Sequence, residues 1–473
     1  MKQRSLALNA ILNTIRQFGA ILFPLITFPY VSRVLQATNY GKYTFSNSII
    51  SYFAMIAALG ITNYAIREGS TLKSSGEKLQ KFSNQVFTIN LITTLVAYLL
   101  LIGLLIIWPK LHDYRTLILI QSVMIFSNTI GLEWLYTIFE DFAYVTVRSL
   151  GVQFVALILM FIFVRTKNDY VIYAIITTFA SSGANVFGFI YARKYIHLSL
   201  TTHLDFRKHI VPMLVLFFNA IAVTIYVNSD ITLIGIFKGD EMVGLYNVAV
   251  RIYTIVKQVL NATVVVTLPR LSFLLSQRRY RTYNSLVVRV FRLLTILVVP
   301  AMVGLISLSS EIIQIIAGDG YLAATGSLQL LSLAILFSIF ASFITTGILL
   351  PRKLEKKILV ATAVGAIVNL LLNLVLIPGL GINGSAITTV IAEALVCVLS
   401  LWYSRKLFNY RQILSAFVPT LIGCCAVYAA CSFSRSQFSN VYIVVIVSIV
   451  ASITVYVIIQ LIYQLVTGIL NHN

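Results

Sequence analysis

The sequence predicts an all-α polytopic membrane protein with about fourteen transmembrane helices. Of its 473 residues, 59% are hydrophobic and only 11% are charged, whereas a soluble domain carries about 25% charged residues. The apolar residues gather in runs of about 20, the length that an α-helix needs to cross a bilayer. The first run, residues 6–34, is too long for the core of a signal peptide and no small-residue cleavage site closes it, so we expect it to stay in the protein.

Hydropathy and length place the spans one after another along the chain. The expected spans are 10–34, 44–64, 82–108, 116–139, 142–164, 170–191, 210–237, 243–268, 286–308, 325–350, 358–378, 382–403, 413–431 and 441–466. No connection between them exceeds about 20 residues, which leaves no room for a soluble catalytic or ATP-hydrolysing domain. We therefore expect a protein that is not an enzyme and that carries no metal and no cofactor, apart from coupling to a H⁺ or Na⁺ gradient.

The net charge of +20 would suggest a nucleic-acid partner in a soluble protein. Here most lysines and arginines lie in the short loops. The N-terminus and the loops after even-numbered spans hold about 21 of them, and the other loops hold about 8. The positive-inside rule then puts both termini in the cytoplasm, so topology explains the charge and we expect no nucleic-acid partner. The remaining basic residues, among them Arg16, Arg148, Arg251, Lys257, Arg289 and Arg292, lie within or at the edges of spans.

A faint internal repeat relates the two halves of the chain. A shift of 203 positions (244 − 41) brings Gly41 onto Gly244 and Thr27 onto Asp230. Transporters are commonly built from two such halves, with the substrate site between them. We expect two pseudo-symmetric six-helix lobes, 1–206 and 207–405, followed by a two-helix appendage at 406–473.

Polar residues in the eighth expected span fall on one stripe. At 100° per residue they lie within an arc of about 80°, and a lone arginine inside a span costs roughly 2.5–3.5 kcal/mol. Hydrogen bonds between helices would explain the amides and the threonine, but not the arginine. The stripe contains Asn247, Arg251, Thr254, Gln258 and Asn261, with Lys257 at its rim.

The first span has a similar polar face, which includes Asn13 and Arg16. We therefore expect a cationic cavity lined by the first two spans of each half. Acidic residues within spans are few: Glu133, Asp230 and Glu393. Each can pair with a basic neighbour, as Glu133 or Glu140 with Arg148, and Asp230 and Glu393 are also candidates for coupling to an ion.

Three stretches resemble a known family. "ITFPYVSRVLQATNYGKYTFSNSIISYFAMIAALGITNYAIRE", "EWLYTIFEDFAYVTVRS" and "NLLLNLVLIPGLGINGSAITTVIAE" are similar to segments of Wzx-type polysaccharide flippases, members of the multidrug/oligosaccharidyl-lipid/polysaccharide (MOP) exporter superfamily. Gln36 stands where that family usually has glycine, and Ile138 where glycine is frequent. The resemblance covers nearly the whole chain.

The resemblance implies a function. Wzx-type proteins move oligosaccharide repeat units linked to undecaprenyl pyrophosphate across the bacterial inner membrane, for capsule, O-antigen or exopolysaccharide synthesis. Guanidinium groups match pyrophosphate oxygens bidentately. The candidate substrate-binding residues are therefore Arg16, Arg251, Lys257, Asn13, Asn247, Gln258 and Asn261, acting by alternating access. Membrane lipids, the polysaccharide polymerase and glycosyltransferases would be partners.

Three alternatives stay open. A lipid II flippase of the same superfamily also has fourteen spans. A drug/cation antiporter usually has twelve, and would suit an anionic cavity better. A membrane polysaccharide polymerase would need a large external loop. The identity of the sugar, the coupling ion, the type of bacterial envelope and the oligomeric state are not readable from the sequence.

Overall fold

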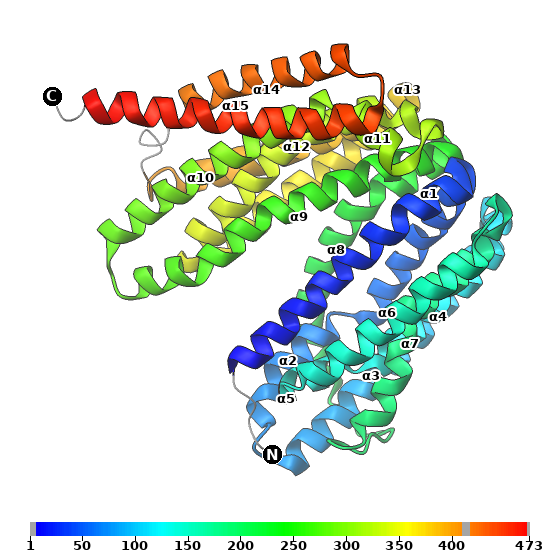
Figure 1. Ribbon diagram of the computed structural model, residues 1–473. Coiled ribbons are helices and arrows are strands. Elements are labelled where there is room, and N and C mark those ends of the chain that lie inside the picture. The colour runs from blue at the N-terminus through cyan, green and yellow to red at the C-terminus, as the bar shows by residue number, and fades with distance from the viewer. Residues whose placement is uncertain (1–5, 409–416, 471–473) are drawn as a thin grey trace. The chain divides into compact units, whose positions relative to one another are not determined.

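The computed structural model describes residues 6–408 and 417–470, and every regular element within these ranges is helical (Figure 1). The predicted all-α class is therefore confirmed. The first half contains α1 (Leu6–Ala58), α2 (Ile61–Leu72), α3 (Gly76–Ile107), η1 (Pro109–Tyr114), α4 (Arg115–Gly131), α5 (Glu133–Phe139), α6 (Phe142–Phe163), η2 (Lys167–Asp169) and α7 (Tyr170–Ala192). It is followed by α8 (Phe206–Phe237), α9 (Asp240–Ser276), α10 (Tyr280–Ser307), α11 (Ser309–Ala317), η3 (Asp319–Ala324), α12 (Thr325–Phe343), η4 (Ile344–Leu349), η5 (Leu350–Arg352), α13 (Glu355–Ser404), α14 (Phe417–Gln437) and α15 (Val441–Leu470).

Eleven helices of the described ranges are long and apolar enough to cross a membrane. Two of these, α1 and α13, are kinked, at Gln36 (φ 62°, ψ 169°) and at Gly381 (φ 59°, ψ −135°). Each kink lies where the sequence predicted a loop between two spans. The chain therefore changes direction inside one helix at both places, and the count of about fourteen spans is approximate.

Contacts divide the chain into two compact units. The first is Met1–Gly235 with Gly239–Gly244, and the second is Ile236–Lys238 with Leu245–Asn473. Helix α8 thus packs almost entirely with the first unit, although the sequence repeat assigns it to the second lobe. The lobe boundaries predicted from the repeat stay a prediction.

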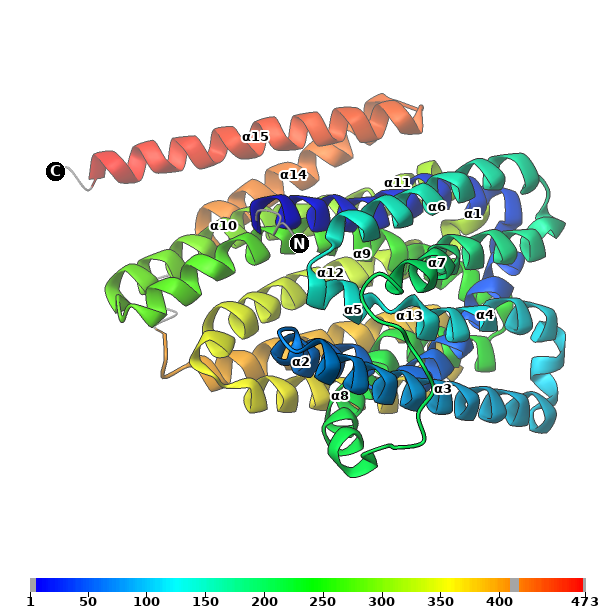
Figure 2. The same cartoon turned by 90° about the horizontal axis from the view of Figure 1, so that it is seen from below.

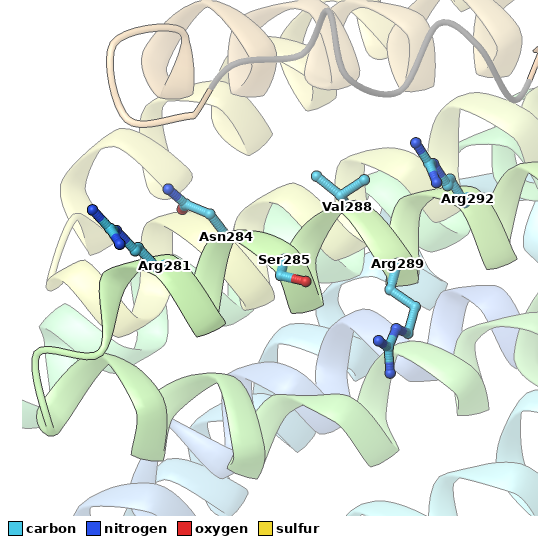
Figure 3. A pocket seen from close by; sticks show the side chains of 6 residues that line it. All are labelled: Arg281, Asn284, Ser285, Val288, Arg289 and Arg292. Carbon is cyan, nitrogen blue, oxygen red and sulfur yellow. The ribbon is translucent and has the colours of Figure 1, made fainter. Parts of the chain in front are cut away.

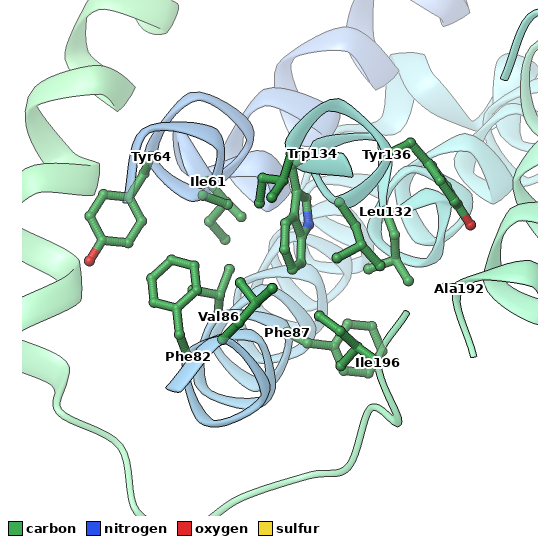
Figure 4. Packing of buried hydrophobic residues seen from close by; sticks show 14 of the residues in the cluster. Ile61, Tyr64, Phe82, Val86, Phe87, Leu132, Trp134, Tyr136, Ala192 and Ile196 are labelled. Atoms are coloured by element: carbon green, nitrogen blue, oxygen red, sulfur yellow. The ribbon is translucent and has the colours of Figure 1, made fainter. Parts of the chain in front are cut away.

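In the first unit, α1 packs against α3, α4 and α6, and α7 packs against α4 and α6. Figure 4 shows the apolar cluster beside these helices, where the short helices α2 and α5 meet α3. Trp134 and Leu135 of α5 pack there with Phe82 and Val86 of α3 and with Ile61 of α2, all of them buried. The cluster fixes α5, which carries Glu133, against α3.

In the second unit, α12 packs against α10 and α13, and α10 packs against α14. Helices α14 and α15 pack against each other and lie along one side of this unit (Figure 2). The two segments of α13 are joined by a buried network, in which Asn369 donates to Thr388 at 3.3 Å and Thr388 donates to Asn373 at 2.6 Å. These hydrogen bonds satisfy polar groups that would be costly in an apolar interior.

Helix α1 closely approaches the first residues of α9, and these residues of α9 belong to the first unit. In each helix the contact lies a few residues after a position of positive φ. Gln36 (φ 62°) and Gly239 (φ 85°) are 203 positions apart, which is the repeat distance. A Cβ atom on Gly41 would lie 1.8 Å from the carbonyl oxygen of Asp240, and one on Gly244 would lie 2.0 Å from that of Ala37. The two contacts are reciprocal under the same shift, because 37 + 203 = 240 and 41 + 203 = 244. Only glycine fits at either position.

Candidate functional site

Arg16 of α1 forms a loose ion pair with Glu133 of α5. The distance from its Nη1 to the Oε1 of Glu133 is 3.4 Å, and the two side chains are 32% and 54% exposed. A pair this open contributes little free energy, because water screens both charges. The guanidinium can therefore exchange its carboxylate for another anion at small cost. The side chain of Asn13, predicted beside Arg16, lies outside the described residues.

Arg148 does not pair with Glu133 or Glu140 as the sequence suggested. Glu140 instead contacts Lys73, at 3.6 Å. Arg148 is buried, and its guanidinium carbon lies 5.3 Å from the ring centroid of Tyr136 and 5.6 Å from that of Tyr144. A guanidinium between two tyrosine faces is stabilised by their quadrupoles. Sequence reasoning missed this because the rings come from two different helices.

The polar residues of the predicted stripe on α9 lie in three different environments. Asn247 is buried, whereas Arg251 and Gln258 are exposed. Asn261 accepts a hydrogen bond from Ser342 of α12 at 2.8 Å. The stripe is thus partly used for helix packing, as the interhelical alternative required. Arg251 and Gln258 remain its accessible polar members.

Lys257 forms a tight and largely buried ion pair with Glu393 of α13. Its Nζ lies 2.9 Å from the Oε1 of Glu393, whose side chain is 8% exposed. The Tyr253 hydroxyl donates to the same carboxylate oxygen at 3.3 Å and accepts a hydrogen bond from Lys257 at 3.1 Å. The structure therefore brings together a residue predicted to bind substrate and one predicted to couple an ion. Their separation of 136 residues in sequence explains why the pairing was not foreseen.

Asp230, the other candidate for ion coupling, is buried on α8 in the first unit. On the same helix, Thr232 donates to the hydroxyl of Ser48 of α1 at 3.0 Å, and Tyr52 lies 3.1 Å from Thr232. The two predicted carboxylates thus belong to different units.

A polar pocket in the first unit was also missed. It has a volume of about 320 Å³, and its lining combines three asparagine amides, Asn90, Asn128 and Asn185, with Ser181 and Glu133. Glu133 is the partner of Arg16, so the pocket lies beside the only predicted substrate-binding cation that the structure describes in this unit. The three amides come from three different helices, α3, α4 and α7, which is why the period of a single helix gave no pattern.

Comparison with known proteins decides the family. The family described as "Polysaccharide biosynthesis protein" matches residues 6–275, which is more than half of the chain. The chain belongs to this family. The predicted resemblance to Wzx-type flippases is thereby confirmed, and so is the prediction that the chain is a multi-pass membrane transporter.

Individual relatives agree with this assignment. A candidate O-antigen transporter of Escherichia coli (strain K12) is 26% identical over 413 residues, which cover 85% of this chain and 97% of that protein. The structure of the lipid II flippase MurJ in an inward closed conformation matches with a TM-score of 0.76 and 20% identity, covering 96% of this chain and 99% of MurJ. An inward-facing multidrug resistance transporter of the MOP superfamily matches with a TM-score of 0.52 and 13% identity, over 84% of this chain and 98% of that one. The likeness to MurJ, at this identity, establishes the fold of this polysaccharide biosynthesis protein.

Proposed function

We propose that this protein is a flippase that moves an oligosaccharide repeat unit, linked to undecaprenyl pyrophosphate, across the bacterial inner membrane with both termini in the cytoplasm. The partly exposed and loosely paired Arg16 carries the proposal. A pyrophosphate crossing a bilayer needs cations, and an accessible guanidinium binds its oxygens bidentately. The family assignment and the named O-antigen transporter relative support the saccharide cargo.

Arg16 and Arg251 would serve as the exchangeable anion-binding groups, by alternating access of the predicted cationic cavity. Before cargo arrives, Arg16 rests on Glu133 at 3.4 Å. An arriving pyrophosphate, with two negative charges or more, outcompetes one half-exposed carboxylate. The asparagine-lined pocket beside Glu133 offers amide donors and acceptors for the hydroxyl groups of the first sugar, and this neutral chemistry suits a saccharide better than a second phosphate.

Lys257 and Glu393 would couple the cargo to an ion. If pyrophosphate takes Lys257 from its partner, the buried Glu393 is left as an unpaired charge, which is strongly unfavourable. Uptake of a proton, or of a Na⁺ ion, neutralises the carboxylate. Anion binding and cation uptake thereby favour each other, which links transport to an ion gradient.

A lipid II flippase is the second candidate, because the fold matches MurJ over nearly its whole length. Both cargoes carry a polyprenyl pyrophosphate, so the arginines do not distinguish them. The distinguishing measurement is transport of the two lipids by one preparation.

The decisive experiment uses purified protein in liposomes loaded with undecaprenyl-pyrophosphate oligosaccharide, with flipped lipid detected by an enzyme added on one side. The Arg16→Ala, Arg251→Ala double variant should lose transport and still fold, and the Lys versions should recover only part of it, because an ammonium lacks the fork. Lys356→Ala, in a predicted cytoplasmic loop, is the matched control. Normal transport by the double variant would overturn the proposal, and transport of lipid II alone would favour the second candidate.

A further inference from the structure

A second polar pocket lies along α10, apart from the residues discussed above. The described residues that line it all belong to that helix, and the pocket is an open one of about 500 Å³; the residues are Arg281, Asn284, Ser285, Val288, Arg289 and Arg292. Arg281 and Arg292 are 11 positions apart (292 − 281), so they project within about 20° of each other, roughly 17 Å apart along the axis. Figure 3 shows Arg281, Asn284 and Arg292 in one row along the helix, with Arg289 extending from the other edge.

Two of the three arginines lie well inside the helix. Arg289 and Arg292 are 9 and 12 positions beyond Tyr280, and they are 3 and 6 positions beyond Leu286, where the expected span begins, which is about 4.5–9 Å into the span. The helix α10 is one of those apolar enough to cross a membrane. Charges inside a span are costly and mark functional positions. Helical side chains lean toward the N-terminal end of their helix. The Cα–Cβ bonds of both arginines therefore tilt toward the Tyr280 end, which the loop charges predict to be cytoplasmic.

The lining residues that the structure describes include no carboxylate. Two other basic groups of the described chain do lie beside a carboxylate: Lys257 lies 2.9 Å from Glu393, and Arg435 lies 2.6 Å from Glu311. The ion pairs found among residues 6–408 and 417–470 do not include Arg281 or Arg289. Three positive charges along one face of a helix, with no carboxylate among the described lining residues, form a favourable site for an anion.

The lining chemistry indicates which anion fits. Guanidinium forks match phosphate oxygens, and the amide of Asn284 and the hydroxyl of Ser285 add neutral donors. Farther along the same helix, Leu293 is 42% exposed and projects about 40° around the axis from Arg289. A ligand with a phosphate at the membrane surface and an apolar chain below it would contact both regions. Basic pockets at the cytoplasmic side of membrane helices bind such headgroups.

We propose that the α10 pocket is a binding site for the phosphate of a lipid headgroup, lined by residues other than the predicted substrate-binding residues of α1 and α9. The phosphate can come from an anionic phospholipid of the bilayer or from a phosphorylated polyprenyl carrier. The site stands whether or not the protein proves to be a flippase.

The test measures lipid binding by the full-length protein, freed of native lipid, with native mass spectrometry. The probes are phosphatidylglycerol, undecaprenyl phosphate, zwitterionic phosphatidylcholine and inorganic phosphate. One variant replaces Arg281, Arg289 and Arg292 with glutamine, and a second replaces them with lysine. The matched control removes three exposed basic residues outside the pocket, by Arg279→Gln, Lys356→Gln and Lys406→Gln. The unfolding midpoint of each variant is measured beside its binding.

Each basic residue near an anionic headgroup contributes about a fivefold change in affinity, so the glutamine variant should bind anionic lipid roughly 100-fold more weakly. The lysine variant should keep part of the affinity, because an ammonium retains the charge and lacks the fork, and the control should change the affinity by less than about fivefold. A tenfold preference for undecaprenyl phosphate over phosphatidylglycerol would assign the pocket to the carrier, and equal affinities would assign it to bilayer phospholipid. Unchanged binding in a folded glutamine variant, an equal loss in the control, or equal affinity for phosphatidylcholine or inorganic phosphate would overturn the proposal.

Discussion

Replacing Gly41 or Gly244 with alanine should destabilise the protein, because each substitution places a methyl group on a backbone carbonyl. An ordinary contact of a Cβ atom begins at 3.4 Å, but the new atom would lie 1.8 Å from the Asp240 oxygen or 2.0 Å from the Ala37 oxygen. The helices must therefore separate by up to 1.6 Å (3.4 − 1.8) or 1.4 Å (3.4 − 2.0). Backbone atoms cannot rotate away as a flexible side chain could.

The expected loss follows from two opposing effects. Overpacking of a close contact costs about 1–3 kcal/mol, and a rigid partner puts these sites at the upper end. Alanine regains up to about 1 kcal/mol of helix propensity. Each single variant should therefore lose about 2 kcal/mol of unfolding free energy, measured by the unfolding midpoint in detergent micelles. Since one separation of the helices relieves both clashes, the double variant should lose clearly less than the sum.

The chain offers matched controls for this prediction. Gly103 on α3 and Gly151 on α6 lie in helix interiors, and an added methyl group would meet nothing within 4 Å at either position. Their alanine variants should be unchanged or more stable by up to about 1 kcal/mol. If Gly41→Ala were as stable as Gly103→Ala, or if the two losses were fully additive, the close reciprocal contact between α1 and α9 would be wrong.

Three further predictions follow from local geometry. Gln36→Gly should raise stability by about 1 kcal/mol, because the exposed Gln36 has a backbone conformation that favours glycine (φ 62°, ψ 169°); a lower unfolding midpoint would contradict this. Lys257→Met or Glu393→Gln alone should lose about 3–5 kcal/mol, and the double variant should lose less than their sum in a double-mutant cycle; additive losses would refute the buried pair. Burial opposes the ionised form of Glu311, but hydrogen bonds from Arg435 and Ser310 outweigh it and lower its pKa. The contribution of Glu311 to the free energy of unfolding is therefore present above the ordinary carboxyl pKa and is lost as the pH falls through the lowered pKa. Wild type and Glu311→Gln should differ in stability at about pH 7 and converge in acid; a difference that does not change with pH would exclude this role.

The spans were predictable because hydropathy reports burial in lipid directly. The kinks were not, because residues 35–43 have the polar composition of a loop. In the structure these polar groups find partners within the helix bundle: the amide of Asn39, for instance, donates to the Lys167 carbonyl at 2.7 Å. The helix can then continue through the segment, with Gln36 absorbing the change of direction. A loop and a kinked helix whose polar groups are hydrogen-bonded can have the same amino-acid composition, so composition does not distinguish them.

The candidate site was predictable to the extent that it depends on one helix. The stripe on α9 follows from the helical period. In the same way, the spacing of 11 residues between Arg281 and Arg292 places both on one face of α10, so the α10 pocket could also have been predicted. What the sequence could not provide was any feature that needs two helices. The pairing of Lys257 with Glu393 is of this kind, and so is the pocket lined by Asn90, Asn128 and Asn185.

The reciprocal crossing of α1 and α9 has an evolutionary consequence. In a two-fold symmetric homodimer, if residue i of one subunit contacts residue j of the other, then residue j of the first subunit also contacts residue i of the second. The Gly41 and Gly244 contacts have this isologous form within a single chain. They are what gene duplication and fusion of a self-associating six-span ancestor would leave behind. In such an ancestor every substitution would act twice, so a strained glutamine at the kink would have been penalised on both copies. Fusion separates the copies, and the difference between Gln36 and Gly239 is a divergence that only a fused gene can accumulate one side at a time.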